Sequence, residues 1–91
     1  MPLRTAQLDA DNRREPKTDH FCVRCHKDLK PGQPFRWVRP TDWSFAQVMH
    51  ADDVDAEVIA ATERGEYPGC FPVGMDCARK IGLSFTAPDV K

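Results

Sequence analysis

The sequence predicts one small α+β domain, and three observations support this fold class. The chain has 91 residues, which is enough for a single domain. Segments whose apolar residues alternate as in β-strands are followed by segments with the spacing of an α-helix. Only 41% of the residues are apolar, and eight prolines and five glycines interrupt the pattern. A domain of this size buries only about 60–65% of the surface that its unfolded chain exposes, so an additional cross-link is expected.

Both ends of the chain are expected to be flexible, with the folded domain between them. Residues 1–18 are polar and show no period, so they are predicted to form an N-terminal arm. The domain is predicted over residues 19–86, and residues 87–91 are predicted to form a tail. No stretch near the N-terminus resembles a signal peptide, and no apolar run approaches the roughly 18 residues of a membrane span. A cytoplasmic protein without membrane contact is therefore expected.

A β-hairpin is predicted in the first half of the domain. Lys30–Gln33 contains Pro31 and Gly32 in the order that a type II turn requires. Phe35–Arg39 alternates for part of its length, and Trp43–Met49 alternates again after a short break that contains a proline. These two segments are predicted to be the antiparallel strands of the hairpin.

Two helices are predicted in the second half. The main helix is predicted over Asp53–Arg64, because Asp52 can cap its start and Gly65 fits the position just after its end. A short helix is predicted over Cys77–Ile81, where a glycine follows the last apolar residue. A short strand at Leu83–Thr86 is expected to complete the domain.

The cysteines indicate a metal site. Cys22 and Cys25 are separated by two residues, a spacing at which both thiolates can bind one ion across a tight knuckle. In a reducing compartment such a spacing favours a metal over disulfides. Cys77 follows Asp76, a predicted N-cap, and the helix start is expected to lower the pKa of its thiol. One structural zinc ion is therefore predicted, held by these three cysteines and one further ligand.

The identity of the fourth ligand is left open by the spacing. His50 is predicted at the end of a strand, where its side chain can reach back to the knuckle, and Cys70 can reach the ion only if the residues before Cys77 loop out. Three protein ligands with a water in the fourth position also remain possible. The other candidates are Asp53, His20 and His26, and the last two adjoin the first cysteine pair so closely that they would strain a shared tetrahedron.

Two short motifs resemble those of a known class of zinc fingers. Residues 22–34 are similar to the opening of many treble-clef-like zinc fingers, in which a C-x-x-C knuckle leads through a Gly- and Pro-containing turn into a β-hairpin. Phe71–Gly82 resembles the G-x-x-C-A-R-K ending of small bacterial and phage zinc-finger proteins, which implies an accessory or host-interaction role. The commoner pattern has a cysteine where this chain has Asp53. The resemblance implies the ligands Cys22, Cys25, His50 and Cys77, with Cys70 as the alternative to His50.

The first cysteine pair also matches two other kinds of site. Together with His26 it forms C-x-x-C-H, the attachment motif of c-type haem, with Met49 or Met75 as the second axial ligand. Cys70 and Cys77 would then have no role, so zinc is favoured. A redox C-x-x-C requires a helix start, whereas a Pro/Gly turn follows here. No catalytic triad or glycine-rich phosphate loop is present, so a non-catalytic protein rather than an enzyme is predicted, and no small-molecule substrate is expected.

The distribution of charge leaves two kinds of partner open. The net charge is −1, but residues 20–41 carry +4 and residues 42–66 carry −6. A protein partner, bound through the acidic helix and aromatic side chains, is slightly favoured because the net charge is close to zero. A nucleic-acid interface would require one basic face. The residues predicted for it are Arg24, Lys27, Lys30, Arg36, Arg39, Arg79 and Lys80.

Overall fold

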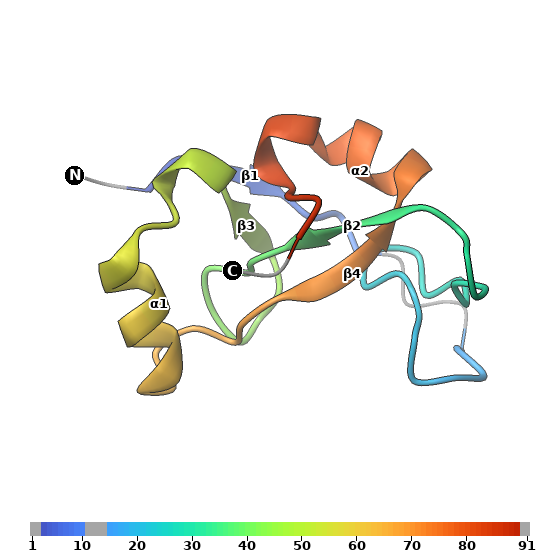
Figure 1. The fold of residues 1–91 in the computed structure, drawn as a ribbon, viewed down its shortest axis with the longest axis horizontal. Helices are drawn as coiled ribbons and strands as arrows, with labels where there is room; N and C mark the ends of the chain where they lie inside the picture. The colour runs from blue at the N-terminus through green and yellow to red at the C-terminus, as the bar shows by residue number, and fades with distance from the viewer. Residues whose placement is uncertain (1–2, 11–14, 90–91) are drawn as a thin grey trace.

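The computed structural model describes residues 3–10 and 15–89, which form a small α+β domain (Figure 1). The elements are β1 (Thr5–Gln7), β2 (Phe35–Val38), β3 (Gln47–Met49), the 3-10 helix η1 (Ala51–Asp53), α1 (Ala56–Glu63), β4 (Phe71–Gly74), α2 (Met75–Ile81) and the 3-10 helix η2 (Leu83–Phe85). The strands form two antiparallel pairs, β1 with β3 and β2 with β4. In Figure 1, α2 lies along the β2–β4 pair, and α1 lies at the other end of the molecule. The predicted fold class is confirmed at this level.

The β2–β4 pair joins two segments that are far apart in the sequence. Phe35 pairs with Gly74, and Val38 pairs with Phe71. Val38 and Val73 are almost fully buried, so apolar burial stabilises this pairing. Since α2 begins directly after β4, the helix is held against both strands without an intervening loop.

The type II turn before β2 is present as predicted. The Gln33 N–H donates to the Lys30 carbonyl at 3.0 Å, and Gly32 has a φ of 81°. A positive φ at this position is the reason that the turn requires glycine. The turn therefore sets the direction in which the chain enters β2.

The predicted hairpin between residues 35–39 and 43–49 is wrong for most of its length. The second segment forms a strand only over β3, and the partner of β3 is β1. The two predicted segments meet only near their ends, where the Met49 N–H donates to the Arg39 carbonyl at 2.9 Å beside the pairing of Pro40 with Val48. The start of the predicted returning strand is a turn instead, because the Asp42 carboxylate accepts a hydrogen bond from the backbone N–H two residues later.

Part of the predicted flexible arm, residues 1–18, belongs to the folded domain. β1 pairs with β3, and Leu8, the residue that follows β1, is fully buried. The Leu8 N–H donates to the Ala46 carbonyl at 2.9 Å. Arg4 binds the Asp53 carboxylate through its backbone N–H and its guanidinium, at 2.9 to 3.1 Å. A three-residue strand offers too few alternating positions to be recognised among polar neighbours, which explains the error.

The main helix starts later than predicted. The residues before it form η1, and α1 begins three residues after the predicted start. Asp55, rather than Asp52, is the N-cap, since its carboxylate accepts a hydrogen bond from the Val58 N–H at 2.9 Å. The predicted end is confirmed, because Gly65 follows the helix with a φ of 86°.

The second helix is confirmed and starts two residues earlier than predicted. Gly74 is its N-cap, so Asp76 lies within the first turn instead of capping the helix. Gly82 follows the last residue with a φ of 113°. The predicted strand Leu83–Thr86 is η2 instead, because the Thr86 hydroxyl donates back to the Leu83 carbonyl at 2.8 Å.

The predicted tail, residues 87–91, also contacts the folded domain. Ala87 exchanges two backbone hydrogen bonds with Trp37 of β2, at 2.8 and 2.9 Å. Residues 1–2 and 11–14 of the predicted arm, and residues 90–91 of the predicted tail, lie outside the described residues. The domain therefore extends beyond the predicted limits at both ends.

One hydrophobic core connects both strand pairs with α2. Its buried members are Leu8, Cys22, Leu29, Val38, Val48, Val73, Cys77, Ala78 and Ile81. Trp37 is half-buried, whereas Trp43 is 65% exposed. None of the helices in the described part of the chain has the length and apolar character that a membrane crossing requires.

Candidate metal centre

Three cysteine side chains converge between the knuckle and the start of α2. The Sγ atoms of Cys22, Cys25 and Cys77 all lie within 4.8 Å of one another, and none of the three cysteines forms a disulfide bond. Four thiolates around zinc, with Zn–S bonds of about 2.3 Å in a tetrahedron, are separated by about 3.8 Å. The three sulfurs therefore need to approach one another by at most about 1 Å, which fits a metal site.

The knuckle is formed by short-range backbone hydrogen bonds. The His26 N–H donates to the Cys22 carbonyl at 2.7 Å, and the Cys22 N–H donates to the Lys27 carbonyl at 2.9 Å. His26 has a φ of 61°, a conformation that is unfavourable for residues with a side chain. The Val23 N–H donates to the Pro72 carbonyl at 2.8 Å, which fixes the knuckle to β4. Both thiols of the pair are thereby positioned beside the element that leads into α2.

Asp28 connects the knuckle to the segment before it. Its carboxylate accepts hydrogen bonds from the Lys17 N–H, the Thr18 N–H and the Thr18 hydroxyl, at 2.8 to 3.1 Å. The backbone hydrogen bond from Lys17, followed by the one from the Thr18 hydroxyl, lowers the pKa of the Asp28 carboxyl. Asp28 therefore stays ionised and holds residues 17–18 against the knuckle.

Cys77 is the ligand candidate from the first turn of α2. Its residue is only 7% exposed, and burial raises the pKa of its thiol to about 12. The Arg24 guanidinium, whose Nη1 donates to Cys77 Sγ at 3.6 Å, opposes this rise, and the neighbouring thiol of Cys22 adds to it. The predicted lowering of this pKa by the helix start is therefore wrong for the metal-free protein, because burial outweighs it. A metal ion has to displace the proton when it binds.

The two predicted fourth ligands lie outside this cluster. His50 Nδ1 accepts a hydrogen bond from the Asp52 N–H at 3.1 Å, and the imidazole packs against the Phe85 ring with centroids 4.9 Å apart. Cys70 precedes β4, whereas Cys77 follows it, so a strand of four residues separates the two cysteines. At about 3.3 Å per residue, that strand holds them more than about 10 Å apart. The resemblance-based set with His50 or Cys70 is therefore not brought together in this structure.

The other three candidates for the fourth ligand have contacts of their own. Asp53 is bound by Arg4, and the hydrogen bonds from Arg4 lower the pKa of the Asp53 carboxyl to about 2. The His20 ring packs against Phe35, with centroids 4.8 Å apart. The His26 ring packs against Phe21, with centroids 5.5 Å apart. Within residues 3–10 and 15–89, the cluster contains only the three cysteines.

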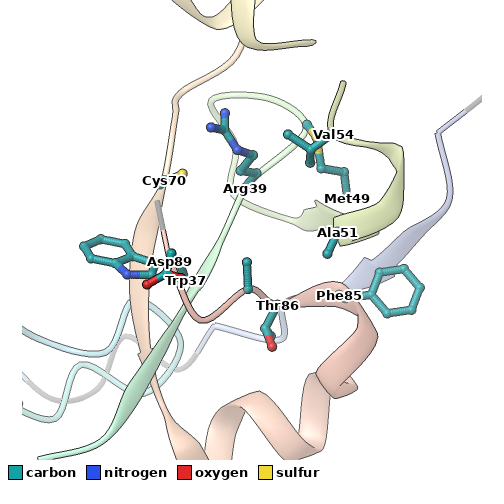
Figure 2. Close-up of a pocket in the computed structure, with 10 residues that line it drawn as sticks. Trp37, Arg39, Met49, Ala51, Val54, Cys70, Phe85, Thr86 and Asp89 are labelled. Atoms are coloured by element: carbon teal, nitrogen blue, oxygen red, sulfur yellow. The ribbon is translucent and has the colours of Figure 1, made fainter. Parts of the chain in front are cut away.

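A small apolar cavity lies beside Cys70 (Figure 2). Its volume is about 20 Å³, which is room for about one water molecule. Figure 2 shows that its lining comes from β2, β3, η1 and η2, together with the segments before β4 and after η2. The lining residues are Trp37, Arg39, Met49, Ala51, Val54, Cys70, Phe85, Thr86, Ala87 and Asp89. At this size the cavity is a packing feature and does not hold an organic ligand.

The seven residues predicted for a nucleic-acid interface differ in their availability. Lys27, Lys30, Arg79 and Lys80 are exposed, and Arg79 pairs with Asp76 at 3.2 Å. Arg39 is only 9% exposed and donates to the Thr62 hydroxyl at 3.4 Å. The other two, Arg24 and Arg36, bind Cys77 and Thr86 within the domain. Three of the seven basic side chains thus make contacts within the domain, and four are exposed.

A groove rich in acidic residues lies between the N-terminal segment and α1. Its volume is about 780 Å³. It is lined by Leu3, Arg4, Asp52, Asp53, Asp55, Glu57, Val58, Ala61, Arg64, Glu66 and Tyr67. The sequence indicated an acidic helix, but it gave no sign that Leu3 and Arg4 form the other wall of this groove. The contact between Arg24 and Cys77 was also missed, because nothing in the spacing connects the two residues.

The structure thus shows a small α+β domain with a three-cysteine cluster that is compatible with a metal ion. The cluster belongs to the hydrophobic core, and the acidic groove lies at α1. Comparisons of the chain with protein-family models, curated proteins and solved structures find no match.

Proposed function

We propose that this chain is a non-catalytic module that binds one structural zinc ion through Cys22, Cys25 and Cys77 and mediates an interaction with another protein. The observation that carries the metal part is the convergence of three sulfur atoms within 4.8 Å from two distant segments. Thiolates favour zinc over hard ions such as Mg²⁺ and Ca²⁺, which prefer oxygen ligands. A reducing compartment such as the cytoplasm would keep the thiols available.

The order of the elements around the cluster supports a treble-clef-like fold. The knuckle is followed by the β2–β4 pair, and β4 leads directly into α2, whose first turn carries Cys77. In this interpretation residues 39–70, which include β3 and α1, are an insertion between the two strands of the hairpin. The ion then joins the knuckle to the helix, and it stabilises a domain of only 91 residues.

A structural role is favoured over catalysis by what surrounds the cluster. Within the described residues, no histidine or carboxylate joins the three cysteines. A catalytic metal usually acts together with a general acid or base within hydrogen-bond reach of the reacting group. Arg24 donates a hydrogen bond to Cys77 Sγ, but its guanidinium stays protonated and cannot serve as a base. The same convergence favours a metal over c-type haem, because haem attachment gives Cys77 no role.

A protein partner is favoured by the acidic groove. Five acidic residues and two arginines line it, so it repels the phosphates of nucleic acids. The half-buried Leu3 and Tyr67 add apolar and aromatic surface of the kind found in protein interfaces. On the basic side, Arg24, Arg36 and Arg39 make contacts within the domain. These observations support a protein partner with a basic surface.

Mass measurement under native and denaturing conditions tests the metal part. The protein is expected to carry one zinc ion that is lost on denaturation. Cys77→Ser is expected to lose the ion, whereas Cys70→Ser and His50→Ala are expected to keep it, since neither residue belongs to the cluster. Absence of zinc from the wild-type protein, or its loss in Cys70→Ser but not in Cys77→Ser, would refute the proposed site.

Binding to nucleic acid tests the choice of partner. The protein is expected to show no affinity for duplex or single-stranded DNA and RNA at low salt. Substantial binding that falls steeply with added salt would show counterion release and would favour the nucleic-acid alternative. Replacing the exposed Lys27 and Lys30 by glutamine would then weaken it, whereas the Glu57→Gln variant serves as the control on the acidic side.

A further inference from the structure

The cluster supplies three ligands to an ion that usually takes four. Zinc in structural sites is almost always bound by four ligands in a tetrahedron. Among residues 3–10 and 15–89, no fourth metal-binding side chain joins Cys22, Cys25 and Cys77. His50 is engaged with the backbone of η1, and Cys70 lies at the cavity of Figure 2. One coordination position is therefore left that none of the described side chains fills.

The surroundings of the cluster indicate the side from which such a ligand enters. Cys22 is 1% exposed and Cys77 is 7% exposed, so both sulfurs are covered by the core. Cys25 lies in the knuckle and is only half-buried; it packs against the core but is not one of its buried members. The accessible side of the cluster is therefore the side of Cys25.

The charge beside the cluster favours an anionic ligand. Three thiolates and one divalent ion leave a net charge of −1, and a fourth thiolate would raise this to −2. The Arg24 guanidinium lies 3.6 Å from Cys77 Sγ and provides one compensating positive charge. Arg24 is half-buried, so water screens its charge only in part. The chain thus carries a fixed cation at the point where a fourth anionic ligand would add charge.

We propose that an external thiolate completes the metal centre, donated by a cysteine of the partner protein or by a small cellular thiol. The inference rests on the zinc binding proposed above. Sulfur is the donor expected, because an ion that already holds three thiolates is matched by a fourth soft ligand, as in sites with four cysteines. On binding, the thiol releases its proton to solvent and its sulfur displaces a water from the ion, with no change of oxidation state.

Cobalt substitution provides the test. The protein is loaded with Co²⁺ in thiol-free buffer and titrated with 2-mercaptoethanol and, separately, with a short peptide that contains one cysteine. The sulfur-to-metal charge-transfer absorption is expected to rise by about a third, saturably, as the thiolates increase from three to four. Tighter binding of the peptide assigns the position to a partner's cysteine, and equal affinity assigns it to a small thiol. An unchanged spectrum would overturn the inference.

Three variants make the test specific. Arg24→Met is expected to weaken thiol binding about tenfold while the cobalt content stays the same, because a charge-assisted contact is lost. Arg79→Met is the matched control, since Arg79 is exposed and pairs with Asp76. Gly74→Cys is expected to fill the position from within and to abolish the response to thiol. Gly74 has a φ of −65°, and a Cβ there would meet only Leu29, at 3.6 Å.

The outcomes separate this inference from the proposed function. If the wild-type protein takes up no ion, both the proposed zinc binding and the external ligand are refuted. If it binds one ion and the spectrum does not respond to thiol, the zinc module stands and the external ligand is refuted. If His26→Ala or His50→Ala alters the spectrum of the cobalt protein without added thiol, a histidine of the chain occupies the fourth position and the inference is also refuted.

Discussion

Replacing Cys77 by serine removes the one cluster ligand that lies outside the knuckle. A bound ion connects Cys25 with Cys77 and so closes a loop of about 50 residues. If the ion acts as a cross-link, closing a loop of this length lowers the entropy of the unfolded chain. The folded state is thereby stabilised by about 4 kcal/mol at room temperature. Cys77→Ser is therefore expected to reduce the free energy of unfolding by about 4 kcal/mol in the presence of zinc.

This loss is large for the size of the domain. A chain of 91 residues has a free energy of unfolding of about 5–14 kcal/mol, so the ion contributes a substantial part of it. For a domain of this length, about 4 kcal/mol corresponds to a fall in Tm of about 15–30 °C. With a chelator present the cross-link is absent from both proteins, so its contribution of about 4 kcal/mol is expected to disappear. What remains is about 1–2 kcal/mol, the cost of burying a hydroxyl, which adds to the cross-link contribution when zinc is present.

Thermal unfolding followed by circular dichroism measures this effect. The wild-type protein, Cys77→Ser and Cys70→Ser are compared with zinc and with chelator. Cys70→Ser is the control, because it makes the same chemical change at a half-buried cysteine outside the cluster. The reasoning would be refuted if zinc raised the Tm of Cys77→Ser as much as that of the wild-type protein. It would also be refuted if zinc failed to raise the Tm of Cys70→Ser.

Three further predictions concern protons and backbone conformation. Zinc affinity is expected to fall as the pH is lowered, because the ion competes with protons for the thiolates. The competition is strong at Cys77, since burial raises the pKa of its thiol to about 12. Competition with a chelator at two pH values measures the change in affinity. His26→Gly is expected to raise the free energy of unfolding by about 1 kcal/mol, since the φ of 61° suits glycine. Urea unfolding measures this free energy. A weaker zinc affinity of the variant would instead mark His26 as a ligand. Arg4→Gln is expected to raise the pKa of Asp53 from about 2 toward 3.8, as observed by NMR titration. The stabilisation from this lowered pKa is present above pH 3.8 and is lost as the pH falls through about 2, so variant and wild type are expected to converge in stability at acidic pH.

The features that could be predicted from the sequence are those set by neighbouring residues. Gly32, Gly65 and Gly82 all have a positive φ at the turn and the two helix ends where they were expected. The spacing of Cys22 and Cys25 predicted a knuckle, and the backbone hydrogen bonds form it within a few residues. Such features depend on the geometry of a few neighbouring residues, and the residue types in the sequence determine that geometry.

The features that could not be predicted depend on which distant segments pair. Phe35–Arg39 was predicted to pair with the next alternating segment. Instead, β2 pairs with β4, which lies more than thirty residues further along the chain. The position of His50 follows from the pairing of β3 with β1, so its distance from the knuckle was not available from spacing. The pKa of Cys77 depends on how deeply the folded chain buries it, which outweighs the helix start seen in the sequence.

Two of the proposed metal ligands are also buried members of the core, and this would determine what a bound ion does for the domain. Cys22 and Cys77 pack in the same cluster as Leu8 and Val48, which lie beside and within the β1–β3 pair. The segment that carries β3 and α1 is therefore joined to the metal centre through buried side chains as well as through the chain itself. Because packed cores respond as units, loss of the ion is expected to weaken the support of the acidic groove at α1 together with the knuckle. In the proposed module the zinc ion would thus help to maintain the binding surface at α1 from a distance.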